Sequence, residues 1–321
     1  MTTDLLYLIA GLVGLVLGGE MLVRGAVAVA RRAGLSPMVI GLTLVGFGTS
    51  TPELVTSVQA AFAGSPGIAV GNVVGSNIVN ILLILGVAVL LAPMAIAPAA
   101  LRRDGGVLVL VSLLALAVVL VGNIGRPIGV GFLLLLIAYV AATLILERRR
   151  PTPAAGIYAA EAEVVAPPAA LPVWRAWLAL LAGLALTIGA ARLLVTGAVS
   201  LATGLGVPEA VIGLTVVALG TSMPELITSV IAARKGEGEV AFGNVVGSNI
   251  FNILGILGVT ALLRPVTVPE QIIRGDIWVM LAATAALVFV ARTGWRIGRH
   301  EGALLVFGYV AYLAALVAAL P

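Results

Sequence analysis

The chain has 321 residues, of which 61% are hydrophobic and 10% are charged, and its 18 Lys and Arg against 14 Asp and Glu give a net charge of +4. Soluble globular domains carry about one quarter charged residues, so this composition excludes an ordinary soluble protein and indicates a chain that lies in a lipid bilayer. Cysteine is absent, which excludes disulfide scaffolds and thiolate metal sites.

Apolar stretches near the length needed to cross roughly 30 Å of hydrocarbon recur along the whole chain. They predict an all-α integral membrane protein with ten transmembrane helices. In chain order, the expected spans cover residues 5–30, 37–62, 69–92, 105–122, 127–147, 174–203, 208–233, 240–263, 272–291 and 302–320.

The basic residues gather on one side of these predicted spans, as the positive-inside rule requires. This topology accounts for the basic composition better than a nucleic-acid partner does, and it places both termini outside. Only Arg126, Arg264 and Arg274 fall outside. The residues expected inside are Arg31, Arg32, Arg102, Arg103, Arg148, Arg149, Arg150, Arg175, Arg234, Lys235, Arg292, Arg296 and Arg299.

The second predicted span contains an ionisable residue, Glu53, within the segment GLTLVGFGTSTPELVTSV at 41–58. A carboxylate at this depth is costly unless it meets a partner or a cavity, so it indicates a functional site. Pro52 directly precedes it and predicts a helix break, because proline cannot donate to the carbonyl four residues back. A kink made only for packing is the alternative.

The third predicted span carries a polar stripe on an otherwise apolar helix. Within GNVVGSNIVNILLILG at 71–86, the residues Asn72, Ser76 and Asn80 are spaced four apart and lie on one face. The sequence leaves open whether Asn72 binds an ion or clamps a neighbouring helix. For Asn77, which points partly elsewhere, we expect a hydrogen bond between helices.

The segment 148–172 is rich in Ala and Pro and lacks apolar periodicity. We interpret it as a flexible cytoplasmic linker that separates residues 1–147 from residues 173–321.

Both polar segments recur after this linker at a constant offset of 172 residues, as GLTVVALGTSMPELITSV at 213–230 and GNVVGSNIFNILGILG at 243–258. The chain is therefore an internal duplication. Because each half holds five predicted spans, an odd number, the second half is expected to enter the membrane in the opposite orientation, giving two inverted five-helix repeats.

The duplication pairs Glu53 with Glu225, and inverted repeats can bring both carboxylates to one central axis. Two carboxylates that repel each other there would be stabilised by a shared cation. The alternative is a salt bridge from each glutamate to Arg24 or Arg192, which also lie within predicted spans, although Glu20 already suits Arg24 as an i, i+4 partner.

Neutral oxygen groups surround the two glutamates in the sequence. The hydroxyls of Thr49, Ser50, Thr221 and Ser222 lie at the helix breaks, and the second polar stripe repeats the first with Asn244, Ser248 and Asn252. Asn249 is expected to behave as Asn77 does. An oxygen-only set of ligands suits Ca²⁺ or Na⁺, and the single histidine, His300, is expected to be solvated in a basic loop.

At these residues the chain resembles the cation/calcium exchanger superfamily, and sodium/calcium exchangers in particular, whose two alpha-repeats carry the paired GTS-x-PE and GNVVGSNI-x-N segments. The resemblance implies a transporter rather than an enzyme, with no cofactor. It implies antiport of about three sodium ions per calcium ion by sliding of the first and sixth helices over the others.

The resemblance also implies roles for individual residues. Glu53 and Glu225 would bridge calcium, aided by the carbonyls of Thr49 and Thr221. Asn80 matches a ligand of the central site, whereas Asn252 stands where some relatives carry aspartate, which argues against potassium cotransport. The implied sodium ligands are Ser50, Ser76, Ser222, Ser248 and the carbonyls of Gly46 and Ala218.

Three other functions compete with sodium-coupled exchange. They are proton-coupled calcium export, a passive cation channel and a membrane scaffold without transport. The expected partners are calcium and sodium ions and the lipid bilayer of a prokaryotic inner membrane, with no nucleic acid. The sequence leaves the oligomeric state open, with a monomer among the alternatives.

Overall fold

The computed structural model describes residues 2–35, 39–40, 46–149 and 172–320. Most of the expected linker, 148–172, and part of the second expected span, 37–62, lie outside these residues. The described chain is almost entirely helical, with four strands of two residues each.

The first half contains ten helical segments and two short strands among its described residues. In order they are α1 (Thr2–Arg32), α3 (Gly46–Gly48), α4 (Thr51–Ala63), α5 (Pro66–Ile78), η2 (Val79–Leu85), α6 (Gly86–Leu91), β1 (Met94–Ala95), α7 (Pro98–Ala100), η3 (Leu101–Gly105), α8 (Gly106–Leu120), β2 (Asn123–Ile124) and α9 (Arg126–Arg149). The segments η2 and η3 are π-helical turns within longer helices.

The second half follows the same plan. Its elements are α11 (Val173–Leu205), α12 (Glu209–Ile212), η4 (Gly213–Val217), α13 (Ala218–Thr221), α14 (Met223–Arg234), α15 (Gly238–Phe251), η5 (Asn252–Leu257), α16 (Gly258–Leu263), β3 (Val266–Thr267), η6 (Ile272–Asp276), α17 (Ile277–Arg292), β4 (Arg296–Ile297) and α18 (Arg299–Ala318).

Among the described residues, eight helices are long and apolar enough to cross a membrane, and the bent pair α12–α13 and α14 raises the number to nine. The protein is thus a multi-pass helical membrane protein. Eight of the predicted spans match unbroken helices, and 208–233 matches the bent pair. The described part of 37–62 consists of the two shorter helices α3 and α4.

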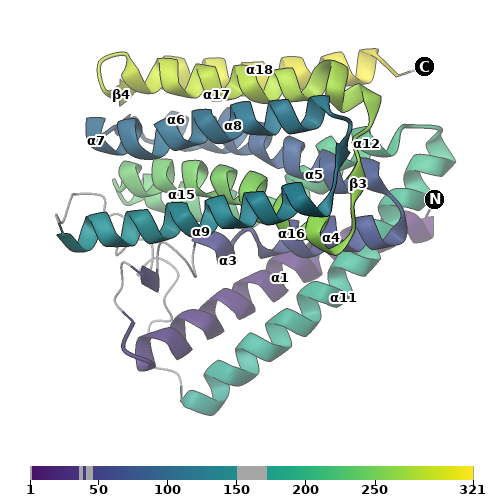
Figure 1. Cartoon of the computed structure of the whole chain (residues 1–321), viewed down its shortest axis with the longest axis horizontal. Helices are drawn as coiled ribbons and strands as arrows, with labels where there is room; N and C mark the ends of the chain where they lie inside the picture. Colours follow the sequence, from purple (N-terminus) through teal and green to yellow (C-terminus); the bar gives the residue numbers. More distant parts are fainter. Residues whose placement is uncertain (1, 36–38, 41–45, 150–171, 321) are drawn as a thin grey trace.

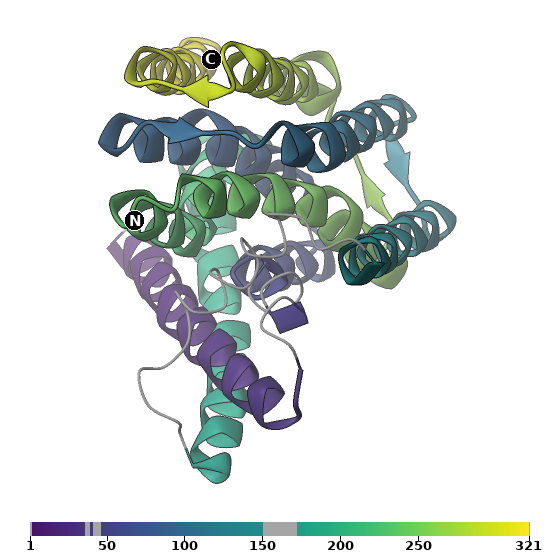
Figure 2. The same ribbon diagram turned by 90° about the vertical axis from the view of Figure 1, so that its left-hand side faces the viewer.

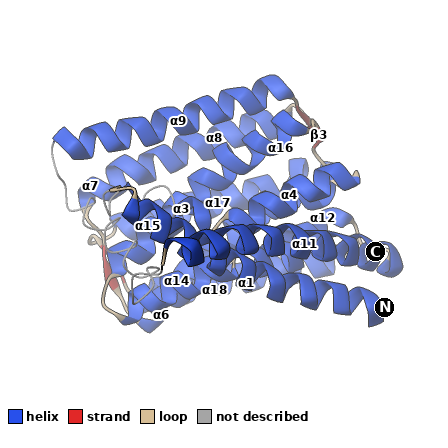
Figure 3. Cartoon of the chain, turned by 90° about the horizontal axis from the view of Figure 1, so that it is seen from below, coloured by secondary structure: helices blue, strands red, loops and turns tan. Residues whose placement is uncertain are grey.

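The helices α1 and α11 form a pair that crosses the remaining helices obliquely, whereas α17, α18, α8, α15 and α9 run in stacked layers (Figures 1 and 2). Seen from below, α1 and α11 lie against each other along one face of the molecule (Figure 3). Glycines bring the two backbones together, since a Cβ on Gly11 would lie only 2.7 Å from the Leu194 nitrogen. Both ends of the described chain lie at the same end of the molecule (Figure 1).

Two antiparallel strand pairs join the halves. Met94 of β1 pairs with Ile297 of β4, and Ile124 of β2 pairs with Val266 of β3. The labels β4 and β3 lie at opposite ends of the molecule (Figure 1). Each pair therefore closes one end of the helical body.

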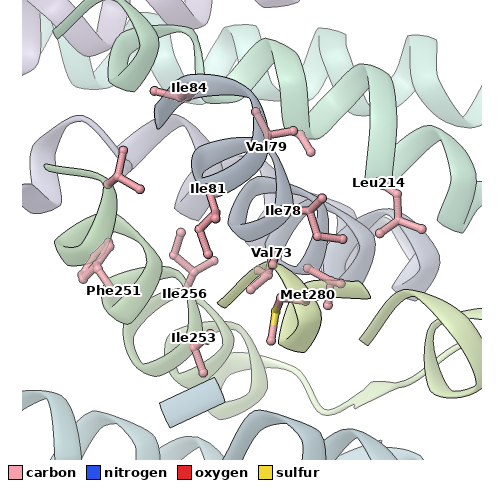
Figure 4. Close-up of a cluster of buried hydrophobic side chains, with 14 of the residues drawn as sticks. Val73, Ile78, Val79, Ile81, Ile84, Leu214, Phe251, Ile253, Ile256 and Met280 are labelled. Atoms are coloured by element: carbon pink, nitrogen blue, oxygen red, sulfur yellow. The ribbon is translucent and has the colours of Figure 1, made fainter. Parts of the chain in front are cut away.

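The most buried spans are α5–η2–α6 and α15–η5–α16, in each of which 83% of an apolar stretch of 18 residues is buried. The other helices expose large apolar side chains, as Leu110, Phe289 and Leu304 illustrate, which suits contact with lipid. Figure 4 shows the apolar cluster between these spans and their neighbours, formed by Val73, Ile78, Val79, Ile81, Ile84, Leu214, Phe251, Ile253, Ile256 and Met280.

Candidate cation site

Two helix breaks create the site. Ser50 has φ −87° and ψ 10° between α3 and α4, and Ser222 has φ −82° and ψ 10° between α13 and α14. In the second half the helix axis bends by 46° at this point. The predicted breaks are confirmed, and each puts a glutamate in the first turn of the helix that follows.

Glu53 and Glu225 are both fully buried, and each accepts a hydrogen bond from the other half. The Ser222 hydroxyl donates to Glu53 Oε1 at 2.9 Å, and the Ser50 hydroxyl donates to Glu225 Oε1 at 2.6 Å. The two carboxylates also lie close enough to interact electrostatically. The site is thus built jointly by the two halves.

Among the described residues, neither Glu53 nor Glu225 forms the alternative salt bridge to Arg24 or Arg192. Arg24 pairs with Glu20 at 2.5 Å, as the i, i+4 spacing predicts, and Arg192 is exposed. Two buried carboxylates without a basic partner need another source of positive charge, because isolated buried charges cost several kcal/mol.

Asn72 and Asn244 hold the glutamate-bearing turns. The Asn72 amide donates to the Glu53 carbonyl at 3.1 Å and to Ser57 at 2.9 Å. The Asn244 amide makes the matching bonds, to the Glu225 carbonyl at 3.3 Å and to Ser229 at 2.9 Å. In this geometry both amides act as clamps, which answers the question that the sequence left open for their nitrogen atoms.

The remaining asparagines lie where α5–η2 meets α15–η5. Asn80 donates to Asn249 Oδ1 at 2.9 Å, and Asn249 donates to the Asn77 carbonyl at 3.4 Å, so the predicted bond between helices is confirmed for Asn249. For Asn77 that prediction is wrong, since its side chain donates to Val73 within its own helix. Val73 is one turn away, and its carbonyl offers the closest acceptor.

Several buried oxygen atoms near the breaks have no hydrogen-bond partner among the described residues. Thr49 and Ser248 lie beside the Glu225 carboxyl, but their hydroxyls are unpartnered. Buried polar atoms are normally paired, so this set marks a place for a ligand rich in positive charge. The unpartnered oxygens on the glutamate-bearing turns and the polar stripes are Glu53 Oε2, Glu225 Oε2, Thr49 Oγ1, Thr56 Oγ1, Ser248 Oγ, Asn77 Oδ1, Asn80 Oδ1, Asn244 Oδ1 and Asn252 Oδ1, and the Asn252 amide nitrogen is unpartnered as well.

Three other predicted residues are engaged with their own helices. The Ser76 hydroxyl donates to the Asn72 carbonyl at 2.5 Å. The Ala218 carbonyl accepts the Ser222 N–H at 3.1 Å, and Gly46 is the first residue of α3. The Ala218 carbonyl also accepts the Thr221 hydroxyl at 3.3 Å, so of these oxygens the Ser76 hydroxyl, which only donates, is the freer one to contact an ion.

Residues that sequence reasoning missed complete the surroundings. Ser57 and Ser229 anchor the asparagine clamps, and their position four residues after each glutamate was the available signal. Phe47 stacks on Phe251 with ring centroids 4.4 Å apart. This contact has no counterpart in the other half, and no pattern in the sequence predicts it.

A cavity of about 290 Å³ lies between α1 and α14 and reaches Thr49. Its lining includes Glu20, Arg24 and Ile231.

No group of three or more His, Cys, Asp or Glu suited to a metal occurs among the described residues. The site instead combines two carboxylates with neutral oxygens, which suits a hard cation that is bound reversibly. Fold and site together define a membrane transporter of the ion-exchanging class, with the cation as cargo.

The chain matches the family model described as sodium/calcium exchanger protein over residues 3–145 and 175–318, and it belongs to that family. It is 39% identical to the antiporter CaxA of Alkalimonas amylolytica, covering 96% of both chains. It is 37% identical to the sodium/calcium exchanger MaX1 of Methanosarcina acetivorans, covering 98% of this chain and 99% of the relative.

The fold is also similar to that of the sodium-calcium exchanger NCX_Mj soaked with Na⁺ and Ca²⁺, with a TM-score of 0.66 and 31% identity over 98% of each chain. The resemblance inferred from the paired motifs is therefore confirmed, and the chain is a transporter, not an enzyme, of the cation/calcium exchanger type.

Proposed function

We propose that this protein moves calcium across a prokaryotic cell membrane in exchange for sodium, by alternating access to one central site. The observation that carries the proposal is the pair of fully buried carboxylates, Glu53 and Glu225, with unpartnered oxygens around them. The family supplies the class of transport, and the relatives named sodium/calcium exchangers support sodium as the coupling ion.

Charge balance supports the stoichiometry. Two carboxylates neutralise one Ca²⁺ or two Na⁺, and a third sodium ion would leave a net positive charge in the site. Exchange of about three sodium ions per calcium ion would therefore be sensitive to membrane voltage. An aspartate at position 252 would add a third negative charge to the site, whereas Asn252 is neutral. We therefore propose exchange that does not require potassium.

In the proposed site, Glu53 and Glu225 bridge calcium together with the carbonyls of Thr49 and Thr221. Sodium binds to hydroxyls and carbonyls at the breaks and on the two polar stripes. The full proposed set is Glu53, Glu225, Thr49, Thr221, Ser50, Ser222, Ser76, Ser248, Asn80, Asn252, Gly46 and Ala218.

We also propose that residues 1–147 and 173–321 are two inverted repeats of five spans each, joined by the linker 148–172. Three features support this arrangement. The clamps and the crossed serine bonds occur in matched pairs. The strands β1 and β3 occupy corresponding places in the two halves, as do β2 and β4, and each strand pairs with a strand of the other half. Ser112 meets Thr284 at 3.2 Å, 172 residues away, as expected for equivalent residues that face each other across an axis.

The distribution of charge supports an orientation with both termini outside. The cavity beside Thr49 extends toward Ile231, in the half of α14 that ends in Arg234, and basic helix ends face the cytoplasm. The proposed state is therefore open to the inside, and sliding of α1 and α11 against the other helices would open the opposite side.

Calcium uptake into proteoliposomes tests the proposal. Purified protein is reconstituted in vesicles loaded with sodium or with potassium, and radioactive calcium uptake is measured at equal pH on both sides. Uptake that requires an outward sodium gradient and disappears in Glu225→Gln is expected. Uptake driven only by a pH gradient would replace sodium with protons as the coupling ion, and uptake that never exceeds equilibrium would indicate a channel.

A further inference from the structure

A second pair of equivalent carboxylates lies outside the candidate cation site. Asp104 and Asp276 are separated by the repeat offset of 172 residues, and both are buried. Arg103 satisfies Asp104 with two hydrogen bonds of 2.8 and 2.9 Å, one to each carboxylate oxygen. Tyr139 donates to the same carboxyl at 3.2 Å. In the first half, the chain itself thus supplies the cation.

The second half keeps the carboxylate but lacks this cation. Tyr312 donates to Asp276 Oδ1 at 2.9 Å, matching Tyr139, but the position equivalent to Arg103 is Gly275. Arg274 pairs with Glu270 and both side chains are exposed. Asp276 is 3% exposed. The Gln271 side chain lies beside its carboxyl, but the Oδ2 atom has no hydrogen-bond partner of good geometry among the described residues.

A cavity lies beside Gly275, the sequence equivalent of Arg103. It has a volume of about 330 Å³ and is lined by Gly275, Asp276, Gln271 and Tyr312 together with apolar side chains of α12, α17 and α18. A Cβ on Gly275 would meet no atom within 4 Å. The missing side chain therefore leaves real space beside the unpartnered oxygen.

We propose that this cavity binds a primary ammonium group. One carboxylate matches one positive charge, and the three polar side chains offer one acceptor for each N–H of an ammonium, with Asp276 Oδ2, the Tyr312 hydroxyl and the Gln271 amide oxygen. A hard divalent metal would want six or more oxygens, which the mostly apolar wall does not provide. That wall suits the methylene groups attached to an amine.

The cavity lies at the end of the molecule where α18 ends and α12 begins (Figure 1), at the boundary of the candidate span that starts at Ile272. An ammonium group at this depth has two sources. One is the headgroup of an aminophospholipid in the surrounding leaflet, and the other is a free alkylamine in the aqueous phase. The site is independent of the proposed transport function.

Native mass spectrometry of the purified full-length protein tests the proposal. Phosphatidylethanolamine and phosphatidylcholine are added at matched concentrations, since the trimethylated headgroup keeps the charge but has no N–H donor. We expect one phosphatidylethanolamine to be retained about tenfold more strongly than phosphatidylcholine. In a second arm, ethanolamine should raise the unfolding temperature more than choline does at equal ionic strength.

Variants at Gly275 separate binding from folding. Gly275→Arg places an arginine beside the carboxylate, as in the first half, and should abolish both the retention of phosphatidylethanolamine and the stabilisation by ethanolamine. Asp276→Asn should abolish them as well. Gly275→Ala is the matched control, which fills little space and should keep both. Retention of the lipid alone identifies the headgroup as the source, and stabilisation by ethanolamine alone identifies a free amine. Equal responses to amines with and without N–H donors, or responses that persist in Gly275→Arg and Asp276→Asn, would overturn the proposal.

Discussion

Replacing Glu53 with glutamine removes one of the two buried charges and keeps the shape of the side chain. The amide oxygen can still accept the hydrogen bond that the Ser222 hydroxyl donates at 2.9 Å, so we expect no shift of the local backbone. Because Glu53 is fully buried, its charge is not screened by water. Removing one partner of a buried charged cluster costs about 3–5 kcal/mol, which corresponds to a loss of calcium affinity of about 10²- to 10⁴-fold.

Calorimetric titration of the purified protein with calcium measures this loss directly, and sodium-driven uptake into proteoliposomes should disappear with it. The ion-free variant should unfold at the same temperature as the wild type or a higher one, because it buries one charge fewer. Glu270→Gln is the matched control, since its side chain is 72% exposed and should bind calcium normally. A Glu53→Gln protein that binds calcium as tightly as the wild type would refute the assignment of the site.

Three further predictions concern the stripes and the crossing helices. Asn252→Asp adds a third carboxylate and should raise calcium affinity at least severalfold while slowing sodium-driven exchange, as titration and flux assays can show. Asn244→Ala removes the clamp on Glu225 and should lower stability by about 1–3 kcal/mol, measured as an earlier thermal transition. Gly11→Ala places a Cβ 2.7 Å from a backbone nitrogen of α11 and should cost about 1–3 kcal/mol. Gly189→Ala is the control, because a Cβ at Gly189 of α11 would meet no atom within 4 Å, and it should leave the stability unchanged in the same unfolding assay.

The sequence was sufficient to predict that Glu53 and Glu225 follow helix breaks and come together between the two halves. Proline, hydroxyl residues and a glutamate within an apolar span leave few structural alternatives, and their repetition at one offset removes most of those. The clamp by Asn72 and the bond between Asn80 and Asn249 needed the structure, because helical spacing fixes which residues share a face but not which neighbouring helix that face meets. The wrong prediction for Asn77 has this same cause.

The paired strands had no sequence signal either. Each has only two residues, too few for an alternating pattern to be visible. Their partners lie in the other half of the chain, so only the packing of the helices brings them together. The spans were predictable by contrast, because length and apolar composition alone decide whether a helix can cross a bilayer. The π-turns η2 and η5 at the polar stripes were also invisible in the sequence.

The crossed hydrogen bonds from Ser50 to Glu225 and from Ser222 to Glu53 bear on how such a protein arises. One half alone would hold a carboxylate in the membrane without the hydroxyl that donates a hydrogen bond to it. If the halves are inverted as proposed, a working ancestor needed two copies of the same chain inserted in opposite directions before the halves were joined in one gene. In that case fusion fixed one copy in each direction, and a difference such as Arg103 in the first half and Gly275 in the second could then arise in one half alone.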